Sequence, residues 1–212
     1  LDTDVTESPL DVISDLSDLP LLLKLMSACP LSDLELEKLF KKLRKSILLN
    51  LSSLKEASPE LIEFQSALAL QCFTNEYIYN NADDEKKSLQ ALERTVKNTF
   101  KKNEQPSPQE ILALASYKAL NQYEWYPSLA VTDKIQVVFT RQVEEPNHEE
   151  KLKQDLPILE EITDSVSSKV REQYEESPYP RWVNLGLPLK PMPISNAVSY
   201  THLRAHETLR YL

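Results

Sequence analysis

The sequence predicts an all-α fold, an irregular helical bundle or a degenerate array of helical hairpins, followed by an extended strap of prolines and aromatic residues. Three observations support this prediction. The 212 residues contain a single glycine, Gly186, whereas β folds with many hairpins need glycine at their turns. Ser-Pro pairs of the kind that begin helices stand at 58–59 and 107–108. Apolar residues recur at spacings of three and four after these signals.

Composition divides the chain into four regions. We expect residues 1–18 to form a loose acidic lead-in, 19–146 a helical domain, and 147–194 a linker helix with the strap. Residues 195–212 change composition abruptly, hold two of the three histidines and resemble a library-derived tail, so we expect them to lie outside the fold. No methionine precedes Met26, and we therefore expect the natural start to lie upstream.

Two helices are predicted before residue 50. A short one spans 21–29 and ends at Pro30, because proline cannot continue a helix. Ser32, with Glu35 three residues later, has the spacing of a capping box and predicts the start of the second helix. Its apolar residues should face a core along one stripe; they are Leu36, Leu39, Phe40, Leu43 and Ile47.

The same helix carries a run of basic residues: Lys38, Lys41, Lys42, Arg44 and Lys45. Their spacing spreads the charges around the polar side of the helix. We interpret the run as a solvated face rather than as a binding site for an anionic partner.

Three more helices are predicted in the middle of the chain. The Ser-Pro pair at 58–59 begins a long helix whose apolar surface is wide enough to imply burial between neighbours. A further helix spans 84–101. The Ser-Pro pair at 107–108, followed by a capping-box glutamate, begins a helix that should reach Gln122.

The last two helices are predicted less directly. Residues 133–145 suit either a helix or a strand, and we favour a helix because no partner strand is evident. A final helix should span 162–176 and stop before Pro178, which disfavours helical geometry at Ser177. No repeat of about 34 residues with the tetratricopeptide pattern is found, so we favour an irregular helical domain.

Composition also limits the function. A net charge of −9 argues against duplex nucleic acid as a partner, since phosphate binding needs a clustered basic face. No apolar run approaches the roughly 20 residues of a membrane span. Two cysteines are too few for a disulfide framework, so we expect reduced thiols and a cytoplasmic protein.

Candidate chemical groups each have a simpler structural interpretation. Cys72 lacks a nearby histidine and is expected to be a small buried hydrophobe. His202 and His206 have the spacing of metal ligands on a helix but lack the zincin glutamate and lie in the tail. The acidic cluster around Pro146 lacks apolar surroundings and is expected to be a solvated loop; it comprises Glu144, Glu145, Glu149 and Glu150. We therefore assign no catalytic residue and no metal ligand.

The most specific segment is Val170-Arg171-Glu172-Gln173-Tyr174-Glu175-Glu176-Ser177-Pro178-Tyr179-Pro180-Arg181-Trp182. It resembles the V-R-x-Q-Y-E-x-N-P-Y-P-R-W segment of bacterial proteins in which a helical, often tetratricopeptide-annotated region precedes a class I S-adenosylmethionine-dependent methyltransferase domain. A second point of resemblance is Q-C-F-x-N-E-Y, which stands here at 71–77. The resemblance extends from about Leu21 to Val183 and departs at Ser177, where that family has asparagine.

The resemblance implies where a cofactor site would lie. In that family the strand and glycine-rich loop that hold S-adenosylmethionine belong to the domain after the strap, and these 212 residues contain neither. The strap could cover the cofactor by stacking and cation–π contacts; its candidate residues are Arg171, Tyr174, Tyr179, Arg181 and Trp182. The alternative, which we favour, is that the strap is a hydrophobic clasp between domains.

Two functions remain open at this point. The resemblance implies a helical region that positions a substrate or partner, such as a protein substrate, for its own C-terminal methyltransferase domain, without an active site of its own. The alternative is a non-enzymatic helical scaffold for protein–protein interaction. The chemistry of any parent enzyme would depend on S-adenosylmethionine in the following domain.

Overall fold

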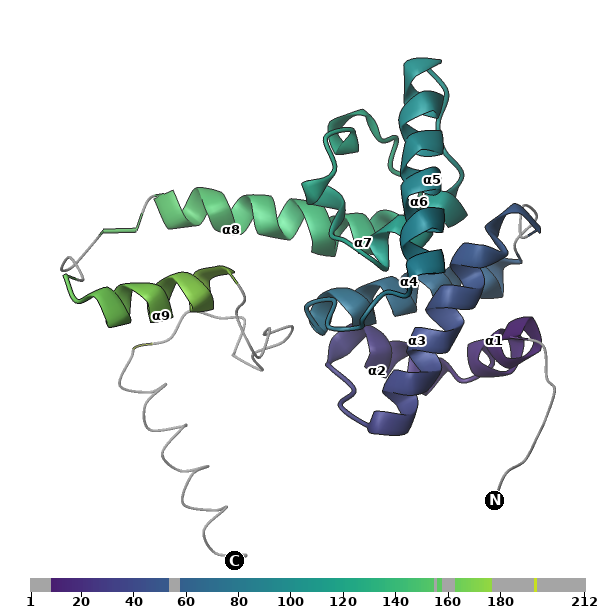
Figure 1. The fold of residues 1–212 in the computed structure, drawn as a ribbon, viewed down its shortest axis with the longest axis horizontal. Coiled ribbons are helices and arrows are strands. Elements are labelled where there is room, and N and C mark those ends of the chain that lie inside the picture. The colour runs from purple at the N-terminus through teal and green to yellow at the C-terminus, as the bar shows by residue number, and fades with distance from the viewer. Residues whose placement is uncertain (1–8, 54–57, 155, 158–162, 177–192, 194–212) are drawn as a thin grey trace, which may run out of the picture.

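The computed structural model describes residues 9–53, 58–154, 156–157, 163–176 and 193. Within these residues it contains helices and turns and no strand, which confirms the all-α prediction. Figure 1 shows helices packed around α4, with α8 and α9 extending to one side of this core. None of the described helices combines the length and apolar character needed to cross a membrane.

The helices are unequal in length. The first six are α1 (Pro9–Ser17), α2 (Pro20–Ala28), α3 (Leu34–Leu49), α4 (Pro59–Thr74), α5 (Asp83–Lys101) and α6 (Pro108–Ala115). Short 3₁₀ turns follow α3 and α6: η1 (Leu51–Ser53), η2 (Leu120–Gln122) and η3 (Tyr126–Ser128). The chain then runs through α7 (Gln136–Phe139), the π-helical turn η4 (Thr140–Glu144), α8 (Glu145–Gln154) and α9 (Ser165–Glu176).

Side-chain caps position the core helices. Ser58 accepts a hydrogen bond from the Leu61 amide at the start of α4, and Ser107 forms the predicted capping box with Glu110 at the start of α6. The prediction for α3 was wrong by one residue. Asp33, not Ser32, is the N-cap, and its carboxylate accepts from the amides of Glu35 and Leu36 at 3.0 Å. A carboxylate caps as well as a hydroxyl and also complements the helix dipole.

Helix α4 is the centre of the fold, as its wide apolar surface predicted. One side of it packs into a cluster formed with α5, α6 and the segment up to Val143; the other side packs against α1, α2 and α3. Ala69 and Phe64, from these two sides, are each fully buried. Because both sides are covered, α4 joins the two clusters into one body.

Two predicted boundaries were wrong. The stretch expected to be a loose lead-in contains α1, whose Ile13 is only 2% exposed; residues 1–8 lie outside the described part. The helix expected to reach Gln122 ends at Ala115. The physical reason is tertiary: the Leu120 amide donates to the side chain of Gln142 at 3.1 Å instead of to a helical carbonyl.

The segment 133–145 is helical, as favoured, but its pitch changes within it. The π turn η4 directs Gln142 inward, where its side chain also donates to the carbonyls of Ala69 and Ala115. The acidic cluster of residues 144–150 was predicted to be a loop, and this prediction was wrong. The cluster forms the end of η4 and the beginning of α8, because Pro146 stands in the first turn of α8, where a proline is tolerated.

Candidate functional site

The predicted cofactor-contacting residues fall into two groups. Arg171 and Tyr174 lie on α9, where Arg171 Nε is 3.4 Å from Glu175 Oε1 and the Tyr174 side chain is 64% exposed. Tyr179, Arg181 and Trp182 lie outside the described residues. A cofactor pocket is concave and encloses most of its ligand. Two exposed side chains on the outer surface of a helix do not form such a pocket, so the described residues do not fit S-adenosylmethionine.

Cys72 is the small buried hydrophobe that was predicted. It is fully buried on α4, and burial raises the pKa of its thiol to about 12, although the nearby Arg44 opposes the shift. A nucleophilic cysteine needs the opposite, a lowered pKa and access for substrate. Within the described chain no three metal-ligating side chains come together, and His202 and His206 lie outside that part.

The Q-C-F-x-N-E-Y stretch ends α4 and connects several elements. Oriented to satisfy its neighbours, the buried Gln71 amide donates to the carbonyls of Met26 and Cys29 and accepts from the Leu31 and Asn75 nitrogens, at 2.9–3.0 Å. Gln71 therefore fixes the α2–α3 connection against α4. After the helix ends, Glu76 and Tyr77 both adopt positive φ, at 52° and 53°, a conformation that costs a non-glycine residue free energy.

The turn that follows α4 is held by tyrosine side chains. The Tyr77 hydroxyl donates to the Ala115 carbonyl at 3.2 Å, at the end of α6. The Asn75 amide donates to the Tyr79 hydroxyl at 3.3 Å. The Tyr77 bond ties the turn to α6, and the Asn75 bond closes the turn itself. Residues 71–75 of the motif are buried, and Glu76 and Tyr77 are half-buried.

Arg44 contradicts the prediction that the whole basic run is a solvated face. The residue is only 2% exposed and projects from α3 toward Glu85 at the start of α5 and Tyr117 after α6. It lies four residues after Phe40 and three before Ile47, both buried, which places it in the apolar stripe of α3. This position was the available signal, and it was missed because arginine was assigned to the polar side by type alone.

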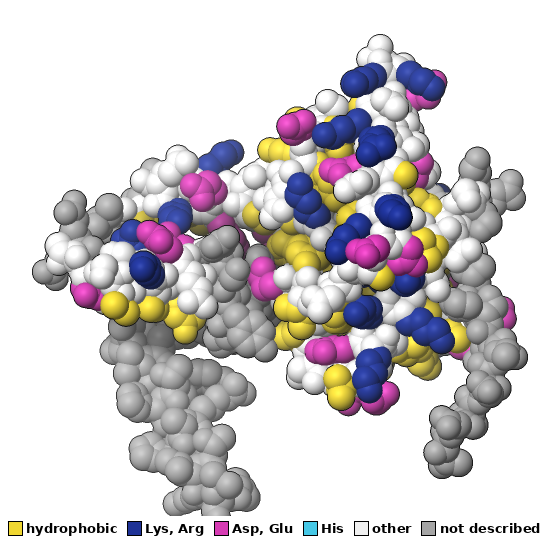
Figure 2. All heavy atoms as spheres, viewed as in Figure 1, with side chains coloured by type: hydrophobic (Ala, Val, Ile, Leu, Met, Phe, Trp, Pro, Cys, Tyr) yellow, Lys and Arg dark blue, Asp and Glu magenta, His cyan; other side chains and the backbone are white. Residues whose placement is uncertain are grey.

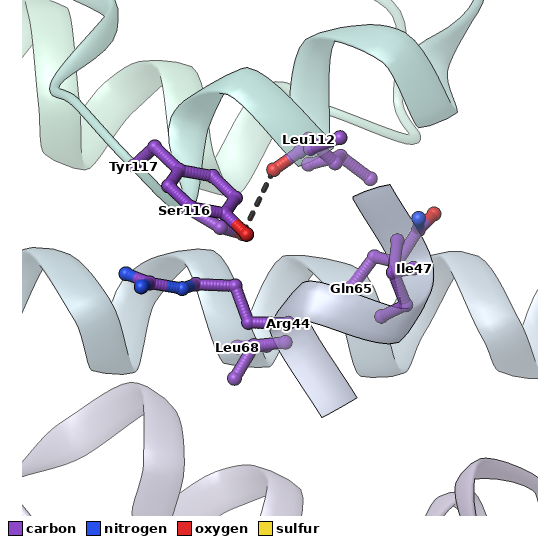
Figure 3. A pocket seen from close by; sticks show the side chains of 8 residues that line it. Arg44, Ile47, Gln65, Leu68, Leu112, Ser116 and Tyr117 are labelled. Carbon is purple, nitrogen blue, oxygen red and sulfur yellow. Dashed lines mark hydrogen bonds between the residues drawn. The ribbon is translucent and has the colours of Figure 1, made fainter. Parts of the chain in front are cut away.

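The Arg44 guanidinium has several partners. Its Nη2 donates to Asn81 Oδ1 at 2.8 Å and lies 3.6 Å from Glu85 Oε1, with both charged side chains 1% exposed. The guanidinium carbon is 4.1 Å from the centre of the Tyr117 ring and 5.4 Å from that of Tyr79. Figure 3 shows Arg44 extended beneath the Tyr117 ring.

Glu85 completes this group, which we call the Arg44 cluster: Arg44, Tyr79, Asn81, Glu85 and Tyr117. Tyr117 donates to Glu85 Oε1 at 2.8 Å, and the Ala82 amide donates to Glu85 Oε2 at 2.8 Å, capping α5. Burial raises the pKa of Tyr117 and brings that of Tyr79 to about 12. Both phenols therefore remain protonated at neutral pH, where Tyr117 donates to Glu85 and Tyr79 accepts from Asn75.

The Arg44 cluster is suited to stability and not to catalysis. The cavity beside it, lined by Gln65, Leu112 and Tyr117 among others, has a volume of about 10 Å³. That volume is about the size of one water. A substrate could not reach the charged groups without opening the core.

Two larger hollows lie on the surface of the described helices. The first, of about 590 Å³, lies where the end of α3 meets α5 and the start of α6; it is lined by Leu48, Leu49, Leu51, Ser52, Leu92, Thr95, Ser107, Gln109 and Glu110. We call it the α3–α5 groove. The second, of about 410 Å³, lies between α1 and the start of α4. The groove is predominantly apolar and large enough for a side chain of a partner.

No protein-family model, curated protein or solved structure matches this chain. The candidate functions below therefore depend on the residues and surfaces described above.

Proposed function

We propose that the chain is a helical positioning region that docks, through α9, onto an adjoining class I S-adenosylmethionine-dependent methyltransferase domain in the bacterial cytoplasm. The observation that carries the proposal is an exposed apolar stripe on α9. Its members are Val166, Val170 and Tyr174, which are 66%, 45% and 64% exposed. Their spacing of four residues places them along one side of the helix.

The opposite side of α9 already has a partner. Glu175 lies nine residues after Val166, half a turn away around the helix, and its carboxylate bonds Lys153 of α8 at 2.9 Å. Helix α9 thus meets α8 through this ion pair, while its apolar stripe is exposed. Burying an exposed valine stabilises an interface by about 1.5 kcal/mol or more, so the stripe favours association with another surface.

The resemblance at 170–182 supports the identity of that surface. Helix α9 carries the first residues of this segment and leads directly into the proline and aromatic strap. The cofactor and the groups that orient the methyl transfer would belong to the adjoining domain, because Arg171 and Tyr174 do not enclose a ligand. The role of this chain is then to position that domain and its substrate or partner.

The test requires the coding sequence that follows this chain at its locus. We expect it to encode a strand followed by a glycine-rich loop, and its product to bind S-adenosylmethionine in a calorimetric titration. The separately purified domain should bind this chain, and Val166→Ser with Val170→Ser should weaken that binding at least tenfold. Val137→Ser is the matched control, since Val137 is 60% exposed but lies on α7.

Two results would contradict the proposal. One is a following sequence without a cofactor-binding domain; the other is domain binding that the α9 double variant leaves unchanged. The first result would favour the second candidate function, a non-enzymatic scaffold for protein–protein interaction. The α3–α5 groove supports that candidate, because it offers a partner an apolar site on the core itself.

A further inference from the structure

Helices α3 and α5 together carry a local excess of positive charge on an acidic chain. They hold ten of the 24 lysines and arginines but only six of the 33 aspartates and glutamates, in a protein of net charge −9. Figure 2 shows these basic side chains gathered on one face, from the tip of α5 down to α3. A local reversal of sign attracts partners of opposite charge at short range.

The basic side chains of this face are only partly neutralised. Four of its lysines pair with carboxylates: Lys38 with Glu35, Lys45 with Asp84, Lys86 with Asp83 and Lys97 with Glu124. Five others have no carboxylate at ion-pair distance among the described residues; they are Lys41, Lys42, Lys87, Arg94 and Lys101. On α5 the free charges follow a spacing of seven, so Lys87, Arg94 and Lys101 form a straight line along the outer side of the helix.

The lysines of α3 lie beside the α3–α5 groove. Leu49 lies four residues after Lys45 and seven after Lys42, on the same side of α3, and it is 43% exposed. Leu49 also lines the α3–α5 groove, together with Leu48 and Leu92. The surface thus combines free positive charges with an adjacent apolar hollow.

We propose that the α3–α5 face binds an acidic polypeptide segment of another protein, with its carboxylates on the free lysines and arginine and an apolar side chain in the α3–α5 groove. This inference is independent of the adjoining methyltransferase domain. A single-stranded nucleic acid fits the surface less well, because the exposed positions of α3 and α5 offer no aromatic ring for a base to stack on.

The probe for the test is a fluorescein-labelled synthetic peptide rich in glutamate, with leucine at its centre. Its binding to the whole chain is measured by fluorescence anisotropy at low and at physiological salt. We expect binding that weakens as salt rises, because the contacts of the lysines are screened. Lys42→Glu with Arg94→Glu should weaken the binding at least tenfold, whereas Lys151→Glu with Lys169→Glu, which changes the net charge equally on α8 and α9, should not.

The groove and the class of partner are tested separately. Leu49→Ser should weaken binding of the leucine peptide several-fold but leave unchanged the binding of a matched peptide with serine at its centre. Because Leu49 is partly exposed, this variant keeps its fold, and circular dichroism checks that. The proposal is overturned if the wild-type chain binds neither peptide, if the two charge variants lose affinity equally, if Leu49→Ser has no selective effect, or if single-stranded or duplex DNA binds more tightly than the peptide.

Discussion

The helical core, which comprises α1 to α7, and the arm formed by α8 and α9 differ in the burial of their ion pairs. In the core, Arg44 and Glu85 are both buried, and Arg44 of α3 meets partners from the segment 79–85 and from Tyr117. In the arm, Lys153 and Glu175 form a pair whose side chains are about half exposed. The arm buries none of its α8 side chains, whereas α4 buries almost all of its own after the first turn.

The difference separates a region built for stability from a region available for association. A buried ion pair has given up its hydration, so it is stable only while every partner is present. An exposed pair keeps water as an alternative partner and can be lost or exchanged with little effect on folding. The polar network of the core therefore resists change, and the two surfaces proposed above for docking lie on the arm and on the outside of α3 and α5.

The largest effect is expected from removing Glu85. Glu85→Ala leaves the Arg44 guanidinium buried without its carboxylate and removes the acceptor of Tyr117, so it should lower the free energy of unfolding by about 3–5 kcal/mol. Urea unfolding followed by circular dichroism measures this change. The matched control is Glu175→Ala in the arm, which should leave the unfolding midpoint of the core unchanged. Equal effects of the two variants would remove the distinction between the regions.

An intermediate effect on stability is expected from replacing the buried amide of Gln65. Gln65 is 1% exposed, and neither atom of its amide has a hydrogen-bond partner in the described part of the chain. A buried amide without a partner costs about 1–3 kcal/mol, so Gln65→Leu should raise the free energy of unfolding by about 1 kcal/mol. Gln142→Leu is the control and should lower the free energy of unfolding. The Gln142 amide makes three hydrogen bonds, and its loss leaves the Leu120 amide without an acceptor. Destabilisation by Gln65→Leu would show that its amide is hydrogen-bonded.

The sequence predicted the local features of this fold well. The Ser-Pro caps at 58–59 and 107–108 are seen as predicted, because the signal and the bonds that it makes lie within four residues. The burial of α4 was also predicted, since apolar residues on both sides of a helix require two packed neighbours. Cys72 was correctly predicted to be a buried hydrophobe, because it lies on this apolar helix.

The features that depend on distant residues were missed. Arg44 is paired with Glu85 and stacked on Tyr117, 41 and 73 residues later in the chain, and no local pattern identifies such partners. The early end of α6 depends on Gln142, whose direction is set by a π turn that no spacing rule predicts. Of the candidate cofactor residues, Arg171 and Tyr174 proved exposed, and the contacts of Tyr179, Arg181 and Trp182 remain a prediction.

A smaller effect is expected at alkaline pH, and it should be confined to the core. Burial raises the pKa of the Cys72 thiol from 9.0 to about 12 and that of the Tyr79 phenol from 10.0 to about 12. The unfolded chain therefore releases these protons first, so stability is complete below about pH 9 and falls until about pH 12. Cys72→Ala or Tyr79→Phe should make the decline of the unfolding free energy with pH less steep. An unchanged slope would show that these groups titrate alike in both states.

The smallest effect on the core is expected from the arm. Val166→Ser with Val170→Ser removes exposed apolar groups of α9 that belong to neither buried cluster, so thermal unfolding of the core should keep its midpoint. Amide hydrogen exchange gives the complementary measurement. The amides of α9 should exchange much faster than those of α4, because an exposed helix opens without disrupting a core. If the double variant lowered the midpoint as Glu85→Ala does, the α9 stripe would be part of the folding unit, and its role as a docking surface would have to be abandoned.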